Sequence, residues 1–393
     1  MIYFTTLVAA ALSLSDIDAV AQKAAAHYQA LESQARTAAR EEGGELKAPR
    51  TYQADAKRLV RVPVTDWTSG HFAGSLWYLA ELTGDTVWVD RAKVWTESHR
   101  RASTITTHHD IGFIIFCSYG NAWRLGKGAD YEEIIRTAAQ SLSVRFNPRL
   151  GLIRSWGPID DTRSFSVIPD NLMNLEMLEW AAKHTPGADG ERFDVIARSH
   201  ADVTMRNHFR ADGGCYHVLD YCQKDGRVQE IRRGQGLGCT TAWSRGQSWG
   251  IYGYTMMYRE TRDEKYLRFA EKLADYAIHH PNMPADGVPY WDYGAPGEER
   301  DTSAAAVMAS ALVELSAYVA EPKATDYFNF ALRQVQSLSS PAYFSQNDEI
   351  GHFLLKHAVG HKPEGKEIDV PLVYGDYYFL EALSRIKRRM THE

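Results

Sequence analysis

The sequence is short of cysteine, and its cysteines show no pairing pattern. Among 393 residues it has four, and none of them forms a CxxC motif: Cys117, Cys215, Cys222 and Cys239. Three lie in the segment 215–239, so a disulfide or a metal site there is an alternative to consider. Reduced and mostly buried thiols are the interpretation that the spacing favours.

Long apolar runs and strongly basic stretches are also missing. Beyond the N-terminus no segment is long and apolar enough to span a membrane, and no low-complexity or basic, aromatic-rich stretch indicates nucleic acid binding. The N-terminus, MIYFTTLVAAALSLSD, is apolar but has no Lys or Arg before the apolar run, which disfavours a signal peptide. We therefore expect a cytoplasmic protein, with a periplasmic or secreted one as the alternative.

Aromatic residues are abundant. The composition is otherwise that of a globular protein, with 44% hydrophobic and 24% charged residues and a net charge of −6. Its 10 Trp and 21 Tyr exceed what a core needs, and many stand in loop-like segments beside Gly, Asp, His and Arg. Sugar rings present C–H faces and hydroxyl edges, so aromatic faces beside hydrogen-bonding groups indicate a carbohydrate site.

Two kinds of helix alternate along the chain. Amphipathic segments occur near 16–40, 86–102, 130–145, 190–206, 264–279 and 324–339. Nearly uncharged segments rich in Gly, Ala, Ser and aromatics begin near residues 67, 110, 170, 244, 301 and 374. A helix that is apolar all round is buried on all sides. Six buried helices alternating with six amphipathic outer ones predict an all-α fold, an (α/α)6 barrel that takes up residues 1–393 as a single catalytic domain.

The loops predict where the functional site lies. Turns after the buried helices are short, whereas the connections before them are long, at 147–169, 207–243, 281–300 and 341–373. Long loops therefore gather where the buried helices begin, at the positive ends of the helix dipoles, which suits an anionic ligand. Within 207–243, alternation around Lys224-Asp225-Gly226 predicts a small β-hairpin over the opening.

Four aspartates stand at or just before the start of a predicted buried helix: Asp66, Asp110, Asp170 and Asp301. Helix N-capping is the ordinary role for each, worth roughly 1 kcal/mol. Asp110, which follows His108-His109, and Asp170, in largely apolar surroundings, are the better catalytic candidates. Adjacent inner helices would bring the two together, and because like charges resist ionising together, one would hold a proton. The spacing does not say which.

The segment 239–249 and the predicted hairpin before it supply candidate substrate contacts. Arg245 suits a carboxylate on the substrate, although an ion pair with an acidic loop residue is the ordinary alternative. His217 and Gln235 are placed to bind sugar hydroxyls, with plain surface polarity as the alternative. The run 108–110 lacks a third ligand such as an HExxH motif would supply, so we expect no metal site and no cofactor.

Seven long segments resemble the unsaturated glucuronyl hydrolases of glycoside hydrolase family 88. They are, in order, DWTSGHFAGSLWYLAELTGD, HHDIGFIIFCSYGNAWRL, VIPDNLMNLEMLEWAA, RNHFRADGGCYHVLDY, AWSRGQSWGIYGYTMMYRET, PYWDYGAP and DVPLVYGDYYFLEAL. The resemblance covers nearly the whole chain and is far more specific than any short motif. It implies an (α/α)6 barrel, in agreement with the helix pattern.

The resemblance also implies a reaction. The enzyme would remove the Δ4,5-unsaturated uronic acid from the non-reducing end of oligosaccharides that polysaccharide lyases leave from glycosaminoglycans or other uronate polymers. Such enzymes hydrate the C4=C5 double bond, whereas most two-carboxylate glycosidases attack C1. The residue matching Asp170 would donate a proton to C4 and activate the water that adds at C5, with the one matching Asp110 assisting. The resulting hemiketal opens and releases the remaining sugar.

The resemblance further implies a set of substrate contacts. Trp67 and Trp243 would stack on the sugar, and the groups that bind its hydroxyls and carboxylate would be His109, His217, Gln235 and Arg245. Trp156, Gln247 and Lys362 complete the expected set. Members that favour sulfated substrates carry a Ser-x-x-Ser-x-Lys pattern, and the comparable stretch here, 357–362, keeps only the lysine. Sulfate preference therefore stays open.

Two other functions stay open as well. One is a related barrel enzyme, such as an unsaturated rhamnogalacturonyl hydrolase or a conventional inverting glycosidase, and the other is a non-catalytic sugar-binding barrel. The expected partner is a small unsaturated oligosaccharide, with no nucleic acid and no membrane, and we expect a monomer or a weak homo-oligomer. The sequence does not identify the parent polysaccharide or the linkage.

Overall fold

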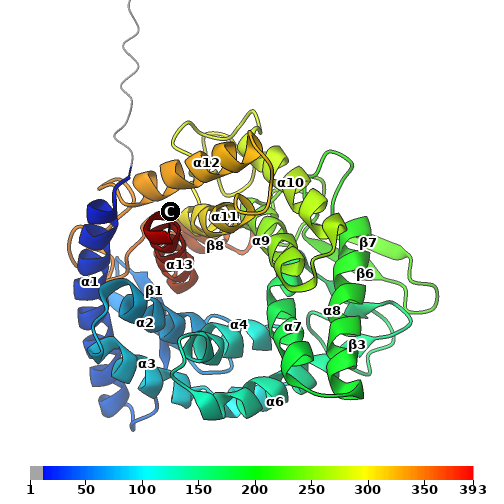
Figure 1. Ribbon diagram of the computed structural model, residues 1–393, viewed down its shortest axis with the longest axis horizontal. Helices are drawn as coiled ribbons and strands as arrows, with labels where there is room; N and C mark the ends of the chain where they lie inside the picture. Colours follow the sequence, from blue (N-terminus) through cyan, green and yellow to red (C-terminus); the bar gives the residue numbers. More distant parts are fainter. Residues whose placement is uncertain (1–11, 393) are drawn as a thin grey trace, which may run out of the picture.

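The computed structural model describes residues 12–392, and helices make up most of it (Figure 1). The helices, in chain order, are α1 (Leu14–Glu41), α2 (Ser69–Thr83), α3 (Val87–Ser98), α4 (Ile111–Ile115), α5 (Asn121–Arg124), α6 (Glu132–Ser143), α7 (Leu175–His184), α8 (Ala188–Asn207), α9 (Ser244–Thr261), α10 (Glu264–Ile278), α11 (Thr302–Leu315), α12 (Lys323–Leu338) and α13 (Val373–His392). A π-helical turn at Phe116–Gly120 joins α4 to α5, and a 3₁₀ turn at Pro169–Asn174 leads into α7.

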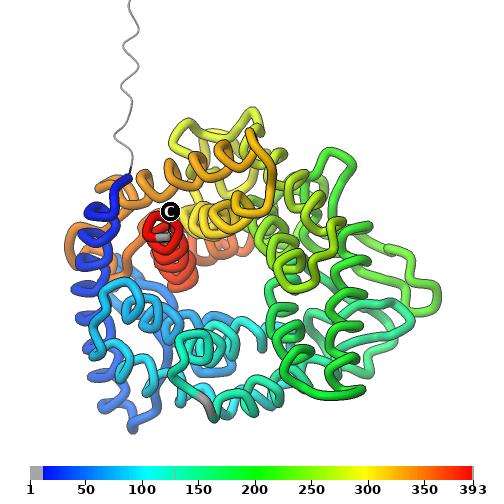
Figure 2. Tube along the Cα trace, viewed as in Figure 1, coloured from blue at the N-terminus to red at the C-terminus, as the bar shows by residue number. Residues whose placement is uncertain are grey.

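The helices form two concentric rings. The inner ring consists of α2, α4 with α5, α7, α9, α11 and α13; each contacts the next, and α13 contacts α2 to close the ring. The outer ring consists of α1, α3, α6, α8, α10 and α12, each packed on an inner neighbour. Followed along the chain in Figure 2, the trace alternates between the rings and goes once around the barrel. The predicted (α/α)6 barrel and its alternation of helix types are confirmed.

Burial follows the residue pattern that distinguishes the two kinds of helix. Every residue of α11 except Glu314 is buried, because this helix has neighbours on all sides and only one ionisable side chain. In α10 only one stripe is buried: Tyr266, Leu267, Ala270, Leu273, Ala274 and Ala277. Close contact between inner helices depends on small residues. A Cβ atom on Gly74 of α2 would lie 2.5 Å from the Cys117 carbonyl oxygen of the neighbouring inner helix.

Short antiparallel hairpins stand in the long loops before the inner helices. They are β1 (Ala48–Gln53) with β2 (Arg58–Val62), β3 (Phe146–Asn147) with β4 (Leu152–Ile153), β5 (Ser166–Val167) with β6 (Val218–Tyr221) and β7 (Val228–Arg232), and β8 (Ala358–His361) with β9 (Lys366–Val370). The hairpin predicted within 207–243 is confirmed as β6–β7. β5 adds a third strand to it and thereby joins the segment before Asp170 to the segment after His217.

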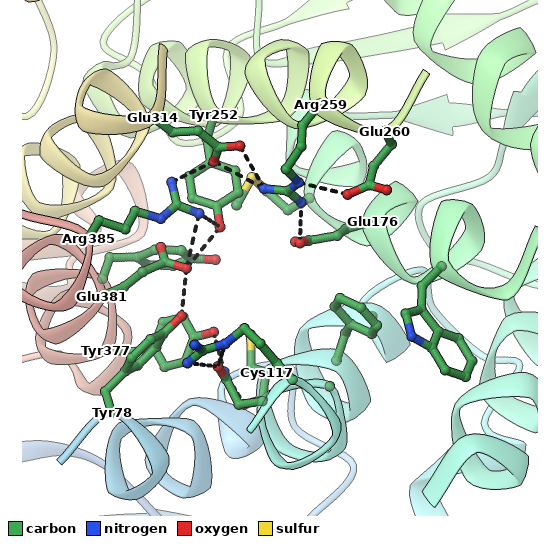
Figure 3. Close-up of a pocket in the computed structure, with 18 of the residues that line it drawn as sticks. Tyr78, Cys117, Glu176, Tyr252, Arg259, Glu260, Glu314, Tyr377, Glu381 and Arg385 are labelled. Carbon is green, nitrogen blue, oxygen red and sulfur yellow. Dashed lines mark hydrogen bonds and ion pairs between the residues drawn. The ribbon is translucent and has the colours of Figure 1, made fainter. Parts of the chain in front are cut away.

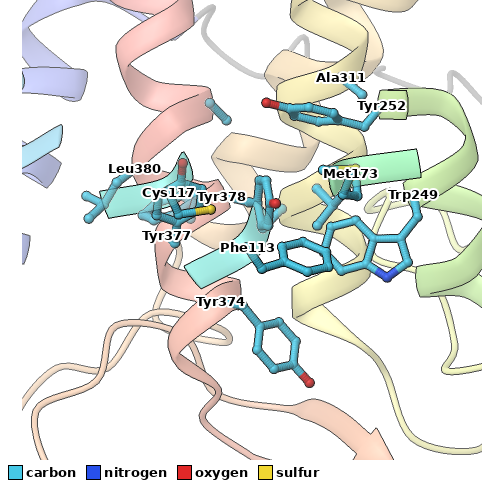
Figure 4. Close-up of a cluster of buried hydrophobic side chains, with 14 of the residues drawn as sticks. Phe113, Cys117, Met173, Trp249, Tyr252, Ala311, Tyr374, Tyr377, Tyr378 and Leu380 are labelled. Atoms are coloured by element: carbon cyan, nitrogen blue, oxygen red, sulfur yellow. The ribbon is translucent and has the colours of Figure 1, made fainter. Parts of the chain in front are cut away.

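A buried aromatic cluster fills the middle of the barrel (Figure 4). The ring of Phe113 lies 5.4 Å from that of Trp249, which lies 5.3 Å from the ring of Tyr378. Met173, from the turn before α7, packs in the same cluster. These side chains come from α4, α9, α13 and the turn before α7, so their packing joins separate parts of the inner ring.

Two sequence expectations concern the ends and the cysteines. Between residues 12 and 392 no helix is long and apolar enough to cross a membrane. The apolar N-terminal run begins in residues 1–11, which lie outside the described part of the chain. Cys117 and Cys215 are buried, Cys222 is partly buried and Cys239 is exposed, and all four are free thiols.

Candidate active site

The four aspartates at the starts of the inner helices fall into two classes. Asp301 is a true N-cap of α11 and accepts hydrogen bonds from the backbone amides of Ser303 (3.0 Å) and Ala304 (3.4 Å). Asp66 accepts from the Thr68 amide at 2.9 Å and is ion-paired with Arg50 at the same distance. For these two carboxylates the ordinary structural role is sufficient.

Asp110 and Asp170 make no such cap. Asp110 occupies the N-cap position of α4, yet its side chain bonds no amide of that helix. Asp170 lies inside the 3₁₀ turn, whose N-cap residue is Ile168, and its Oδ2 has no hydrogen-bond partner within residues 12–392. Asp110 instead faces two imidazoles, His108 Nδ1 and His109 Nε2, each at 3.3 Å. Asp170 is 7% exposed and faces His217 Nε2 at 3.7 Å. The capping explanation therefore fails for the two residues that the sequence marked as catalytic.

The two turns that carry these aspartates are packed against each other. The backbone amide of Phe113 in α4 donates to the Asn174 side-chain oxygen in the 3₁₀ turn at 2.9 Å. Gly112 makes this approach feasible, since a Cβ atom there would lie 2.7 Å from the Asn174 Cα atom. Asp110 and Asp170 are thus held at the same mouth of the barrel, as the inner-helix pattern predicts.

His109 contacts Asp110 and is close enough to Asp170 for that charge to act on its ring. It is 1% exposed, and the negative charges of both Asp110 and Asp170 act on its ring, although burial dominates and lowers its pKa. The Asp110 carboxyl is subject to opposing influences. Burial alone would raise its pKa, but His109, His108 and the Arg145 guanidinium together hold it below the usual value. Asp110 is therefore an anion at neutral pH.

His217, Gln235, Trp243 and Arg245 form one group on the Asp170 side of the mouth. The backbone amide of Gln235 donates to His217 Nδ1 at 2.7 Å, and the His217 ring lies 4.4 Å from that of Trp243. The Arg245 guanidinium stacks 4.5 Å from the Trp243 ring and donates through Nη2 to Gln235 Oε1 at 2.7 Å. The structure therefore brings together four of the predicted substrate contacts.

Arg245 is an internal ion-pair partner in this structure. Its Nη1 donates to Asp301 Oδ2 at 2.9 Å and to the Val359 carbonyl at 2.5 Å, and its Nη2 donates to the Gly360 carbonyl at 2.9 Å. Only Nε is without a hydrogen-bond partner within residues 12–392. The ion pair that the sequence offered as the ordinary alternative is thus present, and the terminal nitrogens are committed to protein acceptors.

Trp67 and Tyr374 complete the wall between Asp110 and Arg245. The Trp67 ring lies 4.8 Å from that of Tyr374, which in turn lies 5.2 Å from the Arg245 guanidinium. The Tyr374 hydroxyl is buried without a hydrogen-bond partner in the described part of the chain. The sequence analysis did not select Tyr374. It stands at the start of the last inner helix, α13, and the starts of the inner helices are where site residues were expected.

The remaining predicted contacts differ in position. Trp156 is 39% exposed on the loop between β4 and β5, and Lys362 follows β8, where its ammonium binds Glu298 (2.6 Å) and Glu299. Gln247 is not at the mouth. Its side-chain oxygen accepts from the backbone amide of Cys215, and its side-chain nitrogen donates to the carbonyls of Gly213 and Leu273. Gln247 therefore lies on the face of α9 turned to α10. Its side chain is thus committed to protein partners, unlike that of Arg245 two residues earlier, which points elsewhere on the helix. Contact of Gln247 with the substrate stays a prediction.

A second space, of about 650 Å³, lies at the opposite end of the barrel, where the inner helices end (Figure 3). A network of ion pairs lines it: Arg259 and Arg385 both bind Glu314, at 2.9 and 2.8 Å, and Arg385 also pairs with Glu381. The Tyr78 hydroxyl donates to Glu381 at 2.7 Å. Phe113, Met173 and Tyr378 of the aromatic cluster in Figure 4 line this space.

The charges of this second space have a structural explanation. Arginines near helix C-termini offset the negative ends of the helix dipoles, and six inner helices end here. Each labelled arginine in Figure 3 is already paired with glutamate. We therefore assign the network to closing the base of the barrel. Among residues 12–392 no cluster of three His, Cys, Asp or Glu side chains suited to a metal ion is found.

Known proteins match this chain over nearly its full length. No protein-family model matches it. An unsaturated glucuronyl hydrolase from Formosa agariphila is 39% identical over 363 residues, which cover 91% of this chain and 89% of that protein. An unsaturated chondroitin disaccharide hydrolase from Streptococcus agalactiae is 30% identical over 352 residues, 87% of this chain and 86% of that protein.

A solved structure agrees with these relatives. The crystal structure of an unsaturated glucuronyl hydrolase specific for heparin superposes with a TM-score of 0.88 at 39% identity, covering 95% of this chain and 98% of that one. The fold and the sequence thus agree on one family. The chain belongs to the unsaturated glucuronyl hydrolase family and is a glycoside hydrolase.

Proposed function

We propose that this enzyme removes the Δ4,5-unsaturated uronic acid from the non-reducing end of lyase-generated oligosaccharides by hydrating the C4=C5 bond. The observation that carries the proposal is the pair Asp110 and Asp170, neither used as a helix cap, with His109 close to both. Family membership supplies the substrate class. The pair supplies groups that hold and move a proton beside a bound ring.

Asp170 is the acid and base of this proposal. One of its oxygens, Oδ2, is buried without a hydrogen-bond partner within residues 12–392, so it is free to act on a ligand. Its proton passes to C4 of the sugar, and water adds at C5 while returning a proton to the carboxylate. The product is a hemiketal at C5, which opens and releases the rest of the saccharide. Each turnover therefore restores Asp170 to its starting state.

Asp110 serves as the fixed anion. Because its pKa is held low by the two histidines and Arg145, it stays ionised while Asp170 exchanges its proton. A negative charge next to the developing positive charge on the sugar ring stabilises it. This division of roles matches two carboxylates whose environments differ.

Arg245 acts through its neighbours. Its terminal nitrogens hold Asp301, Gln235 and the β8 carbonyls, so its effect on substrate comes from positive charge and from the placement of Gln235. The uronate carboxylate is then bound by Gln235, His217 and the Tyr374 hydroxyl, with Trp67 and Trp243 as walls. Trp156 and Lys362, at the rim, contact the sugar beyond the cleaved bond.

The substrates are short acidic saccharides. The names of the relatives include chondroitin disaccharides and heparin, so we propose glycosaminoglycan disaccharides as the first class to test. We also propose that residues 1–393 act as one catalytic domain, because α2 and α13, from opposite ends of the chain, contact each other in the inner ring. We further propose that the enzyme acts in the cytoplasm as a monomer or a weak homo-oligomer.

The experiment is an activity assay on defined unsaturated disaccharides that differ in sulfation and linkage, followed by the loss of the ultraviolet absorbance of the double bond. The wild-type enzyme is expected to remove this absorbance. The turnover rate of Asp170→Asn is expected to be lower by at least about a thousandfold. Asp286→Asn is the matched control, since Asp286 binds Tyr343 and Arg300 in another loop. If Asp170→Asn retains near-wild-type turnover, the assignment is wrong. Cleavage with the double bond intact would indicate a conventional glycosidase.

A further inference from the structure

Arg145, just after α6, is a buried cation with an unusual set of partners. It is 2% exposed, and its donors bind three backbone carbonyls: Nε that of Arg154 at 2.8 Å, Nη1 that of Thr106 at 2.6 Å, and Nη2 that of Gly157 at 3.1 Å. No carboxylate pairs directly with it in the part of the chain that the structure describes. A buried guanidinium that binds only carbonyls is costly to maintain, so its charge calls for an explanation.

The charge that offsets it is that of Asp110. Arg145 and Asp110 act on each other through space: each favours the ionised form of the other. Burial and the nearby Arg154 lower the pKa of Arg145 to about 10, which still leaves it charged at neutral pH. Carbonyls thus fix the Arg145 cation in place, and the Asp110 anion lies at the barrel mouth.

The carbonyls that Arg145 holds belong to the loops that position both aspartates. Thr106 precedes the run 108–110, and Arg154 and Gly157 flank Ser155. The Ser155 carbonyl accepts from the His109 amide at 2.9 Å, and its hydroxyl accepts from the amide of Ile168, two residues before Asp170, at 3.1 Å. Ser155 therefore joins the Asp110 loop to the Asp170 loop, and Arg145 fixes the backbone on either side of it.

We infer that Arg145 is a positioning residue for the reaction, which sets the separation of the Asp110 and Asp170 loops and keeps Asp110 anionic with its fixed charge. This role deepens the proposed function and rests on it. Neither the helix pattern nor the family resemblance assigned any role to Arg145.

Other charged groups face Asp110 and must be kept constant in a test. They are His108 and His109 on its own segment, His71 on α2, and Asp170 through His109. Unlike these groups, Arg145 combines a permanent charge with hydrogen bonds to the supporting loops. Changing Arg145 therefore separates charge from geometry without touching a group that meets the sugar.

Three variants make the test. Arg145→Met removes the charge and the hydrogen bonds, and Arg145→Lys restores the charge with fewer donors. Arg154→Met is the matched control, since Arg154 is as buried and its side chain binds the carbonyls of Ser164 and Asp161. Arg145 holds Arg154 through its backbone carbonyl, which the substitution keeps, and loss of the Arg154 charge leaves Arg145 charged. We expect Arg145→Met to lower kcat by roughly tenfold to hundredfold. The acid limb of its pH profile should shift upward, Arg145→Lys should return that limb toward its wild-type position, and Arg154→Met should leave it in place.

A direct titration separates this inference from the proposed function. The carboxyl ¹³C signal of Asp110, assigned by its loss in Asp110→Asn, reports ionisation whether or not the enzyme turns over. A rise in its pKa of about half a unit or more in Arg145→Met supports the inference. An unchanged Asp110 titration with an unmoved acid limb overturns it, even when the wild-type enzyme is active. Inactivity of the wild type on every unsaturated saccharide would instead count against the proposed function.

Discussion

His217 Nε2 lies 3.7 Å from Asp170 Oδ2, and neither atom has a hydrogen-bond partner within residues 12–392. Both side chains are at least nine-tenths buried. Buried polar atoms are nearly always paired, so an unpaired donor and acceptor facing one another mark a place where a ligand or water belongs. The gap is too long for a direct hydrogen bond between the two atoms.

The first prediction concerns His217. His217→Phe keeps a ring against Trp243 but removes Nε2 from Asp170 and the Nδ1 acceptor from the Gln235 amide. We expect kcat/KM to fall roughly tenfold to hundredfold, because the group that binds and orients the sugar is lost. Steady-state kinetics on an unsaturated disaccharide measures this. Kinetics equal to those of the wild type would show that His217 does not contact the substrate.

The second prediction concerns the contact between the two aspartate turns. Gly112→Ala places a Cβ atom within 2.7 Å of the Asn174 Cα atom, so the turns must separate. We expect a loss of about 1–3 kcal/mol in the free energy of unfolding, together with a fall in kcat. Urea unfolding and kinetics on the same sample check both. Gly297→Ala is the control for replacing a glycine by alanine where no neighbour is displaced, since nothing lies within 4 Å of its added Cβ atom. Its φ of +88° adds some backbone strain to the control. A variant with wild-type kcat would separate the activity from this spacing.

The third prediction is a fall in stability under mild acid. Burial lowers the pKa of His71 and His99 to about 4 and that of His208 to about 3, from an ordinary value of 6.5. Below pH 6.5 the unfolded chain therefore binds protons that the folded chain does not, and the free energy of unfolding decreases as pH falls toward 4. Each unit of pKa difference corresponds to about 1.4 kcal/mol. Above pH 6.5 these groups contribute no pH dependence.

Thermal unfolding between pH 7.5 and pH 5 measures this effect. His99→Gln should flatten the curve, because it removes one of the buried histidines whose pKa is lowered, whereas the exposed His279→Gln should leave it unchanged. A melting temperature that stays level across this range would contradict the prediction.

The fourth prediction concerns selectivity for sulfate. The Lys362 ammonium is already bound by Glu298 and Glu299 and lies 5.2 Å from the Trp291 ring. We therefore expect Lys362→Ala to change the ratio of kcat/KM for sulfated and unsulfated disaccharides by less than about fivefold. A larger loss confined to sulfated substrates would show that this lysine leaves the glutamates to bind sulfate.

Much of the fold could be predicted from the sequence, because a helix that is buried on all sides has almost no charged residues. Segments such as 302–315 contain almost no charge, and their alternation with amphipathic segments is enough to predict two rings. The π turn at 116–120 has no such pattern. It depends on tertiary contacts, such as the Cys117 carbonyl against Gly74, which the local sequence does not specify.

The site was predictable in part for a similar reason. Asp110 and Asp170 stand at helix starts that the pattern located, and their sequence surroundings distinguished them from Asp66 and Asp301. The resemblance then implied a separate role for each. The direction of the Gln247 side chain was not predictable, because proximity in sequence to Arg245 does not put two side chains on one helix face. Arg145 was missed because its significance lies in three carbonyls from distant loops, a relationship that only the folded chain reveals.

The central claim is that water adds to the C4=C5 bond with Asp170 as the acid and base. Its most direct test is turnover of an unsaturated disaccharide in water enriched in ¹⁸O, with the position of the label in the released uronic acid read by mass spectrometry before it exchanges. The account predicts that the label enters at C5 and that Asp170→Asn gives no labelled product. Label at C1 would show ordinary glycoside hydrolysis and would contradict the account.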